Sequence, residues 1–270
     1  MNSVLIRHER MSRARLTLQR LGFVAALLLL WEGATGGFGL PPVLEPIIVA
    51  RPSSAVTEIG AYAASGLLAK DLAATLQATS IGLALGIVGG VAFGLLLGYA
   101  RGTAETVEPV LIAFNSLPRI ALAPVLVIAF GLGITSKIFL AFLTVFFVIF
   151  FNTYLGIRSV DPELVKAVRV MGGTRSDLAR YVILPSVFSW IFAALRTSVS
   201  FALSGAVVGE FVGSTAGLGY RMAISTGLLD TNRTYAILLL LMAIAVTLVE
   251  IAKRVENRLL RWRPTSALVA

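Results

Sequence analysis

Two ionisable side chains interrupt apolar stretches of this sequence and are the first candidates for chemistry. Arg196 lies about ten residues into the stretch 186–209, roughly 15 Å from its start if the stretch is helical. An arginine at that depth in a membrane is costly, and it usually faces a bundle interior or a water-filled cavity. Arg196 therefore either contacts an anionic solute or is structural, bonded to helix carbonyls or to a neighbouring acid.

Glu210 cannot pair with Arg196 within one helix, because the fourteen residues that separate them span about 21 Å. It lies near the outer end of its stretch, where it either contacts an external protein or caps a helix. Arg119, directly after Pro118, is expected to snorkel towards the inner boundary of the membrane. Arg196 and Glu210 are thus the candidates for a solute pathway.

The residue types that most enzymes and metal sites use are nearly absent. The chain has one histidine, His8, and no cysteine, which leaves no histidine-based site and excludes thiolate ligands. The phosphate-binding pattern G-x-x-x-x-G-K-[ST] does not occur either. The sequence therefore predicts no catalytic, cofactor-binding or metal-binding residue, and we do not expect an enzyme.

A polar segment between two apolar stretches, residues 161–185 (DPELVKAVRVMGGTRSDLARYVILP), carries the most organised pattern. Asp161 is a good N-cap, and Pro162 suits the first position of a helix, where no amide donor is needed. Gly172 and the glycine after it predict the end of this helix, because glycine tolerates the left-handed conformation. The apolar stripe of this helix consists of Leu164, Val168 and Met171.

A second short helix is predicted to start at Thr174, since Thr174 and Asp177 have the spacing of a capping box. Pro185 marks the return to the membrane. Each cap stabilises a helix by on the order of 1 kcal/mol, so the segment is predicted to hold one conformation. Its exposed stripe with basic flanks favours a groove of a partner protein and a surface of anionic lipid headgroups equally.

The elements that must position these residues are membrane helices. Of the 270 residues 57% are hydrophobic and only 14% are charged, and the mean hydropathy is +0.88. The apolar stretches approach the roughly 20 residues that a span needs and lack the alternation of lipid-facing strands. We therefore predict an all-α integral membrane protein with about six transmembrane helices. The six stretches are 21–39, 73–99, 110–132 (interrupted by prolines), 138–157, 186–209 and 234–252.

The distribution of basic residues predicts the orientation. Sixteen of the 23 Lys and Arg residues fall in the two tails and in the loops 100–109 and 158–185, against five on the opposite side. By the positive-inside rule both termini and the 158–185 loop are cytoplasmic. The net charge of +9 therefore does not indicate nucleic-acid binding. The basic N-terminus followed by LGFVAALLLL is expected to be an uncleaved first span rather than a signal peptide.

Glycines recur every fourth residue in the second apolar stretch. This spacing makes a ridge without side chains on a helix, so another backbone can approach closely, within the chain or from a second subunit. The ridge predicts a tight helix-packing seam at Gly82, Gly86, Gly90, Gly94 and Gly98.

These features divide the chain into five parts, of which the outer connection includes a short surface helix from Pro52 to about Gly66. The parts are a basic cytoplasmic tail (1–20), the first transmembrane helix (21–39), the outer connection (40–71), the core transmembrane domain (72–252, with a cytoplasmic loop at 159–185) and a second basic cytoplasmic tail (253–270).

The polar segment resembles the cytoplasmic loop of permease subunits in binding-protein-dependent ATP-binding cassette (ABC) importers. The pattern of that loop is E-A-A, three residues, glycine, nine residues, then I-x-L-P. Its places are taken here by Lys166, Ala167, Val168, Gly172, Val182, Leu184 and Pro185. Lysine and valine depart from the family's glutamate and second alanine, while Glu163 lies one turn earlier.

Four further phrases are similar to the nitrate, sulfonate and taurine branch of these permeases, and the similarity covers about residues 40–264. They are FGLGITSKIFLAF (130–142), NTYLGIRSVDPELV (152–165), GEFVGSTAGLGY (209–220) and ENRLLRWRP (256–264).

The resemblance implies a type I ABC importer permease fold, in which the loop between the fourth and fifth spans is a coupling helix that lies in a cleft of an ATPase subunit. It favours the protein groove over the lipid surface for this segment. The residues implied in ATPase coupling are Glu163, Leu164, Lys166, Ala167, Val168, Met171, Gly172, Leu184 and Pro185.

The resemblance also implies the partners and the cargo. It implies two copies of an ATPase subunit, which would bind ATP and Mg, a second permease copy in a homodimer, and a periplasmic or lipid-anchored solute-binding protein. The location would be the lipid bilayer of a bacterial inner membrane, and the solute a small anion such as an aliphatic sulfonate, taurine or nitrate.

The rival interpretation is a stand-alone secondary transporter or channel. Such proteins are marked by inverted repeats or by paired broken helices with several acids near the midplane, and the sequence has neither. A membrane-embedded enzyme is the third interpretation, and it lacks a constellation of histidine or aspartate residues.

Overall fold

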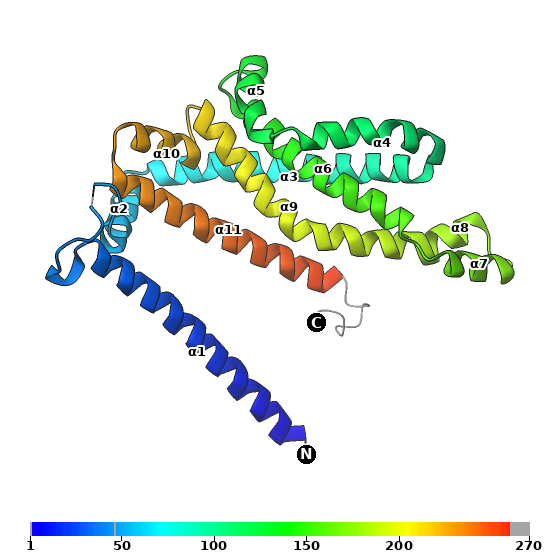
Figure 1. Cartoon of the computed structure of the whole chain (residues 1–270), viewed down its shortest axis with the longest axis horizontal. Coiled ribbons are helices and arrows are strands. Elements are labelled where there is room, and N and C mark those ends of the chain that lie inside the picture. Colours follow the sequence, from blue (N-terminus) through cyan, green and yellow to red (C-terminus); the bar gives the residue numbers. More distant parts are fainter. Residues whose placement is uncertain (1, 46, 260–270) are drawn as a thin grey trace. The chain divides into compact units, whose positions relative to one another are not determined.

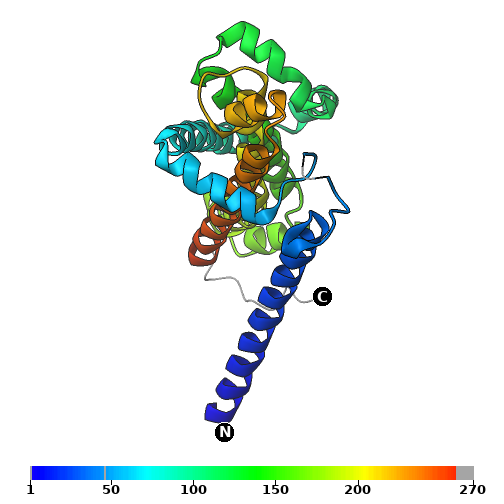
Figure 2. The same cartoon turned by 90° about the vertical axis from the view of Figure 1, so that its left-hand side faces the viewer.

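A computed structural model of the chain describes residues 2–45 and 47–259, without the side chains of residues 2–17, 101 and 103–105. These residues form helices joined by loops, with no strand among them, as two views show (Figures 1 and 2). In chain order the elements are α1 (Asn2–Ala34), η1 (Gly37–Gly39), α2 (Pro52–Ala64), α3 (Leu67–Tyr99), α4 (Arg101–Ser116), η2 (Arg119–Leu122), α5 (Ala123–Phe130), α6 (Ile134–Arg158), α7 (Pro162–Val170), α8 (Arg175–Leu178), η3 (Ala179–Ile183), α9 (Leu184–Val212), α10 (Leu218–Gly227) and α11 (Thr231–Leu259).

Four of these helices are long and apolar enough to cross a membrane, or five if a bent pair counts as one span. The four are residues 67–99, 134–158, 175–212 and 231–259, and the bent pair is Thr106–Ser116 with Arg119–Phe130. The all-α membrane class is thus confirmed. The predicted first span, residues 21–39, falls in α1 and η1 and stays a prediction, as do both cytoplasmic tails, of which residues 260–270 lie outside the described residues.

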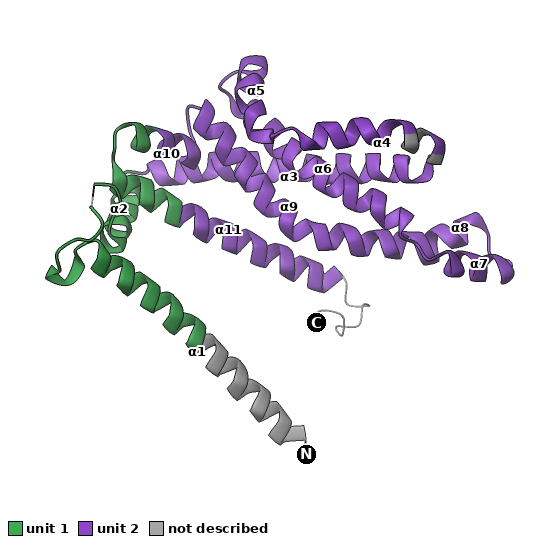
Figure 3. Ribbon diagram, in the orientation of Figure 1, with its two compact units in different colours: residues 1–65, 224–239 green, residues 66–223, 240–270 purple. Residues whose placement is uncertain are grey.

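The chain divides into two compact units (Figure 3). Unit 1 comprises residues 1–65 and 224–239, and unit 2 comprises residues 66–223 and 240–270. In unit 1 the surface helix predicted after Arg51 forms as α2, with Pro52 at its start. Glu32 of α1 caps it by accepting hydrogen bonds from the amide and the hydroxyl of Ser53, at 3.0 and 2.7 Å. These contacts tie α1 to the connection at residues 40–71.

The core of unit 2 is built from α3, α6 and α9, which pack against one another. All five ridge glycines of α3 are buried and face α6. A Cβ built on each would lie 2.3 to 2.8 Å from a side-chain atom of α6, which is closer than real Cβ contacts allow. The α6 residues met in this way are, in order, Ala141, Val145, Ile149, Thr153 and Ile157. Both rows advance by four residues, so the two helices run in the same direction along the whole seam.

The glycine ridge provides a matched stability test. Gly90→Ala places a methyl group 2.8 Å from the Ile149 Cβ and 2.9 Å from the Phe146 carbonyl oxygen, so the two helices must separate. We expect a loss of about 1–3 kcal/mol, the usual cost of overpacking. Gly89→Ala meets only ring atoms of Phe142 and Phe146 at 3.4 Å and should be neutral or stabilising. Thermal unfolding of both variants in lipid nanodiscs measures the difference, and equal midpoints would contradict the close seam.

The third apolar stretch bends, as its prolines predicted. α4 ends at Ser116, Leu117 is extended before Pro118, and the chain turns by 82° into η2 and α5. Proline cannot donate the amide hydrogen that would continue α4, and the residue before it avoids helical backbone angles. The bend leaves Arg119 at the break rather than at the end of a continuous helix.

Candidate functional site

The polar segment forms a capped helix, α7, at one end of α6 (Figure 1). Asp161 is its N-cap and accepts a hydrogen bond of 2.8 Å from the Glu163 amide, and Pro162 occupies the first turn. Lys166 forms an exposed ion pair of 2.8 Å with Glu163. The lysine that departs from the family pattern thus holds a glutamate one turn earlier, which keeps an acid and a base on this surface.

The end of α7 and the start of α8 follow the predicted caps. Gly172 has a φ of +77°, the left-handed conformation, and the amide of Gly173 bonds to the Val168 carbonyl oxygen at 2.9 Å. Thr174 and Asp177 form a reciprocal capping box. These bonds satisfy backbone groups at the helix ends from within the segment, so its shape does not depend on a partner.

The second helix is not the separate short helix that we predicted. α8 continues through η3, a π-helical turn, into α9, and together they make one helical run from Arg175 to Val212. Pro185 near the start of α9 lacks the amide hydrogen for a regular helical bond, and its ring needs extra room in the preceding turn. A π turn supplies that room, so the helix continues past the proline.

The tip of this hairpin exposes apolar side chains. Leu164 and Met171 of the predicted stripe are 53% and 77% exposed, and Ala167 and Gly172 are also exposed. Val168 is half-buried, because it packs against Gly173.

Sequence patterns missed Val170, which is 87% exposed and therefore more accessible than any residue of the stripe. Tyr181 is also exposed, at 67%. Val170 falls outside the stripe because it belongs to the last turn of α7, whereas the sequence spacing of Leu178, Tyr181 and Val182 predicts an apolar face that includes Tyr181, which lies in the π turn. Leu184 and Pro185, predicted for coupling, are half-buried at the base of the hairpin. The exposed apolar tip is therefore made by Leu164, Val170 and Met171.

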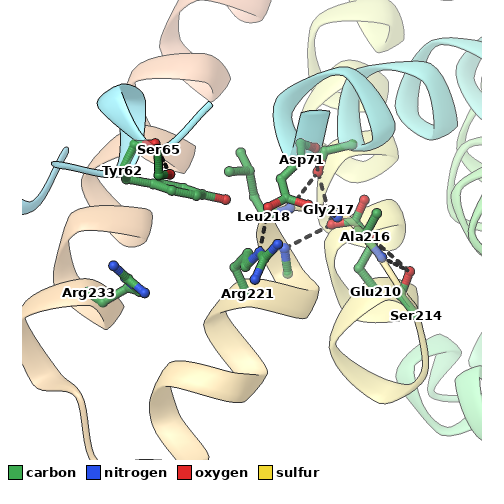
Figure 4. Close-up of polar contacts among 12 residues, drawn as sticks. Tyr62, Ser65, Asp71, Glu210, Ser214, Ala216, Gly217, Leu218, Arg221 and Arg233 are labelled. Carbon is green, nitrogen blue, oxygen red and sulfur yellow. Dashed lines mark hydrogen bonds and ion pairs between the residues drawn. The ribbon is translucent and has the colours of Figure 1, made fainter. Parts of the chain in front are cut away.

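A second polar site surrounds Glu210 at the other end of α9, where its carboxylate is buried (Figure 4). Glu210 accepts hydrogen bonds from the Gly219 amide at 2.9 Å and from the Thr75 hydroxyl at 3.0 Å. The Thr75 oxygen in turn accepts from the Leu218 amide at 2.9 Å. The first amides of α10 are therefore capped by side chains of two other helices.

Asp71 of α3 completes this cap. It is fully buried, accepts a hydrogen bond of 2.9 Å from the Gly217 amide, and forms an ion pair of 2.6 Å with Arg221 of α10. Carboxylates at a helix N-terminus are stabilised by its partial positive charge. We name Asp71, Thr75, Glu210 and the amides of residues 217–219 the outer cap. The helix-cap interpretation of Glu210 is the one that this geometry favours.

Two glycines allow the connection between α9 and α10 to approach the carboxylates of Glu210 and Asp71 closely. Gly217 has a φ of +116°, and a Cβ there would lie 2.2 Å from the Glu210 carboxyl carbon. A Cβ on Gly219 would lie 2.3 Å from the Val207 carbonyl oxygen. The loop is rich in glycine, as the printed sequence shows, but its acceptors Asp71 and Thr75 lie more than 140 residues away in the chain.

A buried lysine of α6, Lys137, was another residue that sequence patterns did not single out. It is 1% exposed, and its amino group donates to the carbonyl oxygens of Leu132 and Gly133 at 2.8 and 2.9 Å and to the Ser136 hydroxyl at 3.1 Å. The ammonium therefore holds the loop before α6 by hydrogen bonds to its carbonyls.

Arg196 has an acidic partner in α11. Its guanidinium forms a hydrogen-bonded ion pair of 2.8 Å with Glu256, and the two side chains are 45% and 14% exposed. The structural interpretation of Arg196 is thus supported, through an acid sixty residues away that the sequence did not indicate. The outer cap and the Arg196 pair use separate residues, so the structure does not join Arg196 and Glu210 in one site.

We expect the Arg196–Glu256 pair to add little stability. Solvent screens an arginine that is 45% exposed, and such pairs usually contribute below about 1 kcal/mol. A double-mutant cycle with Arg196→Gln and Glu256→Gln, followed by unfolding in bicelles, should give a coupling energy below that value. A coupling of several kcal/mol would indicate that the membrane shields the pair.

The described side chains contain no group of three histidine, cysteine, aspartate or glutamate residues arranged to hold a metal ion. The polar side chains described above, in the hairpin and in the outer cap, make hydrogen bonds and ion pairs that fix the backbone at helix ends. The helical run that contains α9 thus has an exposed apolar tip near one end and a braced loop at the other.

A family model described as "Binding-protein-dependent transport system inner membrane component" matches residues 82–261. The chain is 39% identical to the riboflavin transport system permease protein of Chloroflexus aurantiacus, over 87% of each chain. It is 33% identical to the formylaminopyrimidine transport permease protein of Halalkalibacterium halodurans, over 94% of this chain and 99% of the relative. It is 29% identical to a putative aliphatic sulfonates transport permease protein of Bacillus subtilis, over 91% and 90%.

Solved structures show the same fold. An inward-facing methionine ABC transporter superposes with a TM-score of 0.63 over 72% of this chain and 96% of the other, at 21% identity. An amino acid ABC transporter matches with a TM-score of 0.59 over 75% and 96%, at 20% identity.

Proposed function

We propose a function on the premise that this chain belongs to the family of binding-protein-dependent transport system inner membrane components, whose members are ABC transporter permeases. It is, in this proposal, the membrane-spanning subunit of an ATP-driven importer for a small solute. The observation that carries the proposal is the rigid hairpin of α7 and α8, which exposes Leu164, Val170 and Met171 at its tip. Exposed apolar side chains on a self-capped element fit a preformed protein groove.

ATP is handled by another polypeptide in this proposal. The chain has no G-x-x-x-x-G-K-[ST] loop, so the nucleotide and Mg belong to an ATPase subunit, present in two copies. A second copy of the permease completes the membrane part, and an external solute-binding protein, periplasmic or lipid-anchored, delivers the cargo. A bacterial inner membrane is the proposed location.

The geometry suggests how movement of the ATPase reaches the outer side. The helical run Arg175–Val212 has 38 residues and so extends about 57 Å at 1.5 Å per residue. It starts in the hairpin and ends two residues beyond Glu210, which holds α10 through the outer cap. A displacement of the docked tip would therefore move α9 as a lever and carry the α10 loop with it.

Two classes of solute are compatible with the family. A small anion, such as an aliphatic sulfonate, taurine or nitrate, is our first candidate, and a sulfonate permease and a taurine permease are among the relatives. An uncharged heterocycle is the second, because the riboflavin and formylaminopyrimidine permeases are the more similar in sequence. The solute-binding protein is expected to select between them.

The competing function is a stand-alone secondary transporter or channel. Within residues 2–45 and 47–259 the structure has one bent helix pair, at residues 106–130, but transporters of that class pair two broken helices in corresponding halves. A self-capped hairpin with an exposed apolar tip is not among the features that mark such a protein.

Reconstitution with and without ATPase tests the function. We expect the chain to co-purify with the ATPase subunit produced from the same operon, and uptake into proteoliposomes to require that subunit, the solute-binding protein and ATP. Solute uptake by the chain alone, without ATP, would establish the competing function instead.

A further inference from the structure

We propose that a cavity beside Arg119 binds the anionic end of the solute during its passage, an inference that rests on the proposed function. The cavity has a volume of about 420 Å³ and lies between the α4–η2 break, α6 and α9 of unit 2. Pockets of about 300–1,000 Å³ hold small organic ligands. The site is distinct from the outer cap and from the Arg196 pair.

The break in the bent helix pair places Arg119 on the cavity wall. Its terminal nitrogen donates to the Asn115 side-chain oxygen, and its guanidinium lies 5.8 Å from the centroid of the Phe147 ring. The Nε–H group is buried and has no hydrogen-bond partner. A buried donor without an acceptor is rare in proteins, and the absence requires an explanation.

No protein carboxylate neutralises this guanidinium within the part of the chain whose side chains are described. The ion pairs of arginine there join Arg196, Arg221, Arg233 and Arg254 to acids, but not Arg119. An arginine in an apolar span is costly unless paired, and such residues often line solute pathways. Arg119 lines the cavity, and a guanidinium can hold a carboxylate or sulfonate through two parallel hydrogen bonds.

The rest of the wall fits a small amphiphilic anion. Ser204 contributes a hydroxyl group, whereas the Thr144 hydroxyl already donates to the carbonyl oxygens of Ala141 and Phe201. Leu140, Phe201 and Val208 contribute apolar surface. A charged end would bind at Arg119 while a short hydrocarbon part contacts the apolar residues. This arrangement favours the anionic class of solute over the uncharged heterocycle.

Binding of butane-1-sulfonate to the full-length chain in nanodiscs tests the proposal, with uncharged butane-1-sulfonamide as its near-isostere. Titration calorimetry at constant ionic strength should show saturable sulfonate binding and at least tenfold weaker sulfonamide binding. Arg119→Gln should weaken sulfonate binding at least tenfold, since a charge-assisted hydrogen bond is lost. Arg119→Lys should retain part of the affinity, and Arg196→Gln should leave it unchanged.

Ser204→Phe is the second variant, in case Arg119→Gln does not fold. Ser204 is exposed on the cavity wall, so the added ring should block binding without removing the charge. Equal binding of the two probes by the wild type, or unchanged sulfonate binding in Arg119→Gln or Ser204→Phe, would overturn the proposal. No detectable sulfonate binding by the wild type would also overturn it.

Association with the ATPase subunit, measured on the same preparations, separates the two proposals. If the wild type binds the ATPase but shows no preference for the sulfonate, the proposed anion site is ruled out and the proposed permease function stands. If the wild type does not bind the ATPase, the proposed permease function is ruled out, whatever the calorimetry shows.

Discussion

Leu164→Asp should abolish ATP-driven uptake while the protein still inserts into the membrane. Leu164 is 53% exposed on α7, so the substitution disturbs no internal packing. In an apolar groove of the ATPase the new carboxylate would be desolvated without a partner, which costs about 3 kcal/mol or more. That corresponds to association weakened by a factor of more than about one hundred. Co-purification with the ATPase and proteoliposome uptake measure the effect.

The matched control is Leu228→Asp, the same substitution at a residue that is 75% exposed after α10. It should leave association with the ATPase unchanged. Gly172→Val should weaken coupling by a smaller factor, because a β-branched residue is strained at a φ of +77°. Unchanged association and uptake in Leu164→Asp and Gly172→Val would show that the hairpin is not the docking element.

Asp71→Ala should destabilise the protein by about 3–5 kcal/mol, the usual result of breaking a buried ion pair on one side. The substitution leaves the Gly217 amide without its acceptor and removes the carboxylate that faces Arg221. The N-terminus of α10 would lose one of its three side-chain caps. The midpoint of thermal unfolding should fall, and hydrogen exchange of residues 213–219 should become faster.

A double-mutant cycle separates the ion pair from the cap. Asp71→Ala with Arg221→Ala should cost less than the sum of the two single variants, since no unpaired charge then remains. The exposed pair of Glu163 and Lys166 is the control, with a coupling below about 1 kcal/mol. Strict additivity at Asp71 and Arg221 would contradict the assignment of a desolvated pair.

Local patterns accounted for the hairpin between α6 and α9. The N-cap at Asp161, the left-handed Gly172 and the capping box of Thr174 and Asp177 involve residues at most five positions apart. Such bonds form from the segment's own atoms, so composition and spacing predicted them. The same local argument failed at Pro185, because whether a proline ends a helix or only bends it depends on room for a π turn.

The sequence by itself determined the membrane class, the capped polar segment and the presence of a glycine ridge. All three follow from hydropathy, helix periodicity and short-range hydrogen bonds, which act over a few residues. The partners across the fold came only from the tertiary structure: α6 for the ridge, α10 for Glu210, Glu256 for Arg196, and a cavity for Arg119. These residues belong to different helices and meet according to how the helices pack, and no pattern within a single helix specifies that arrangement.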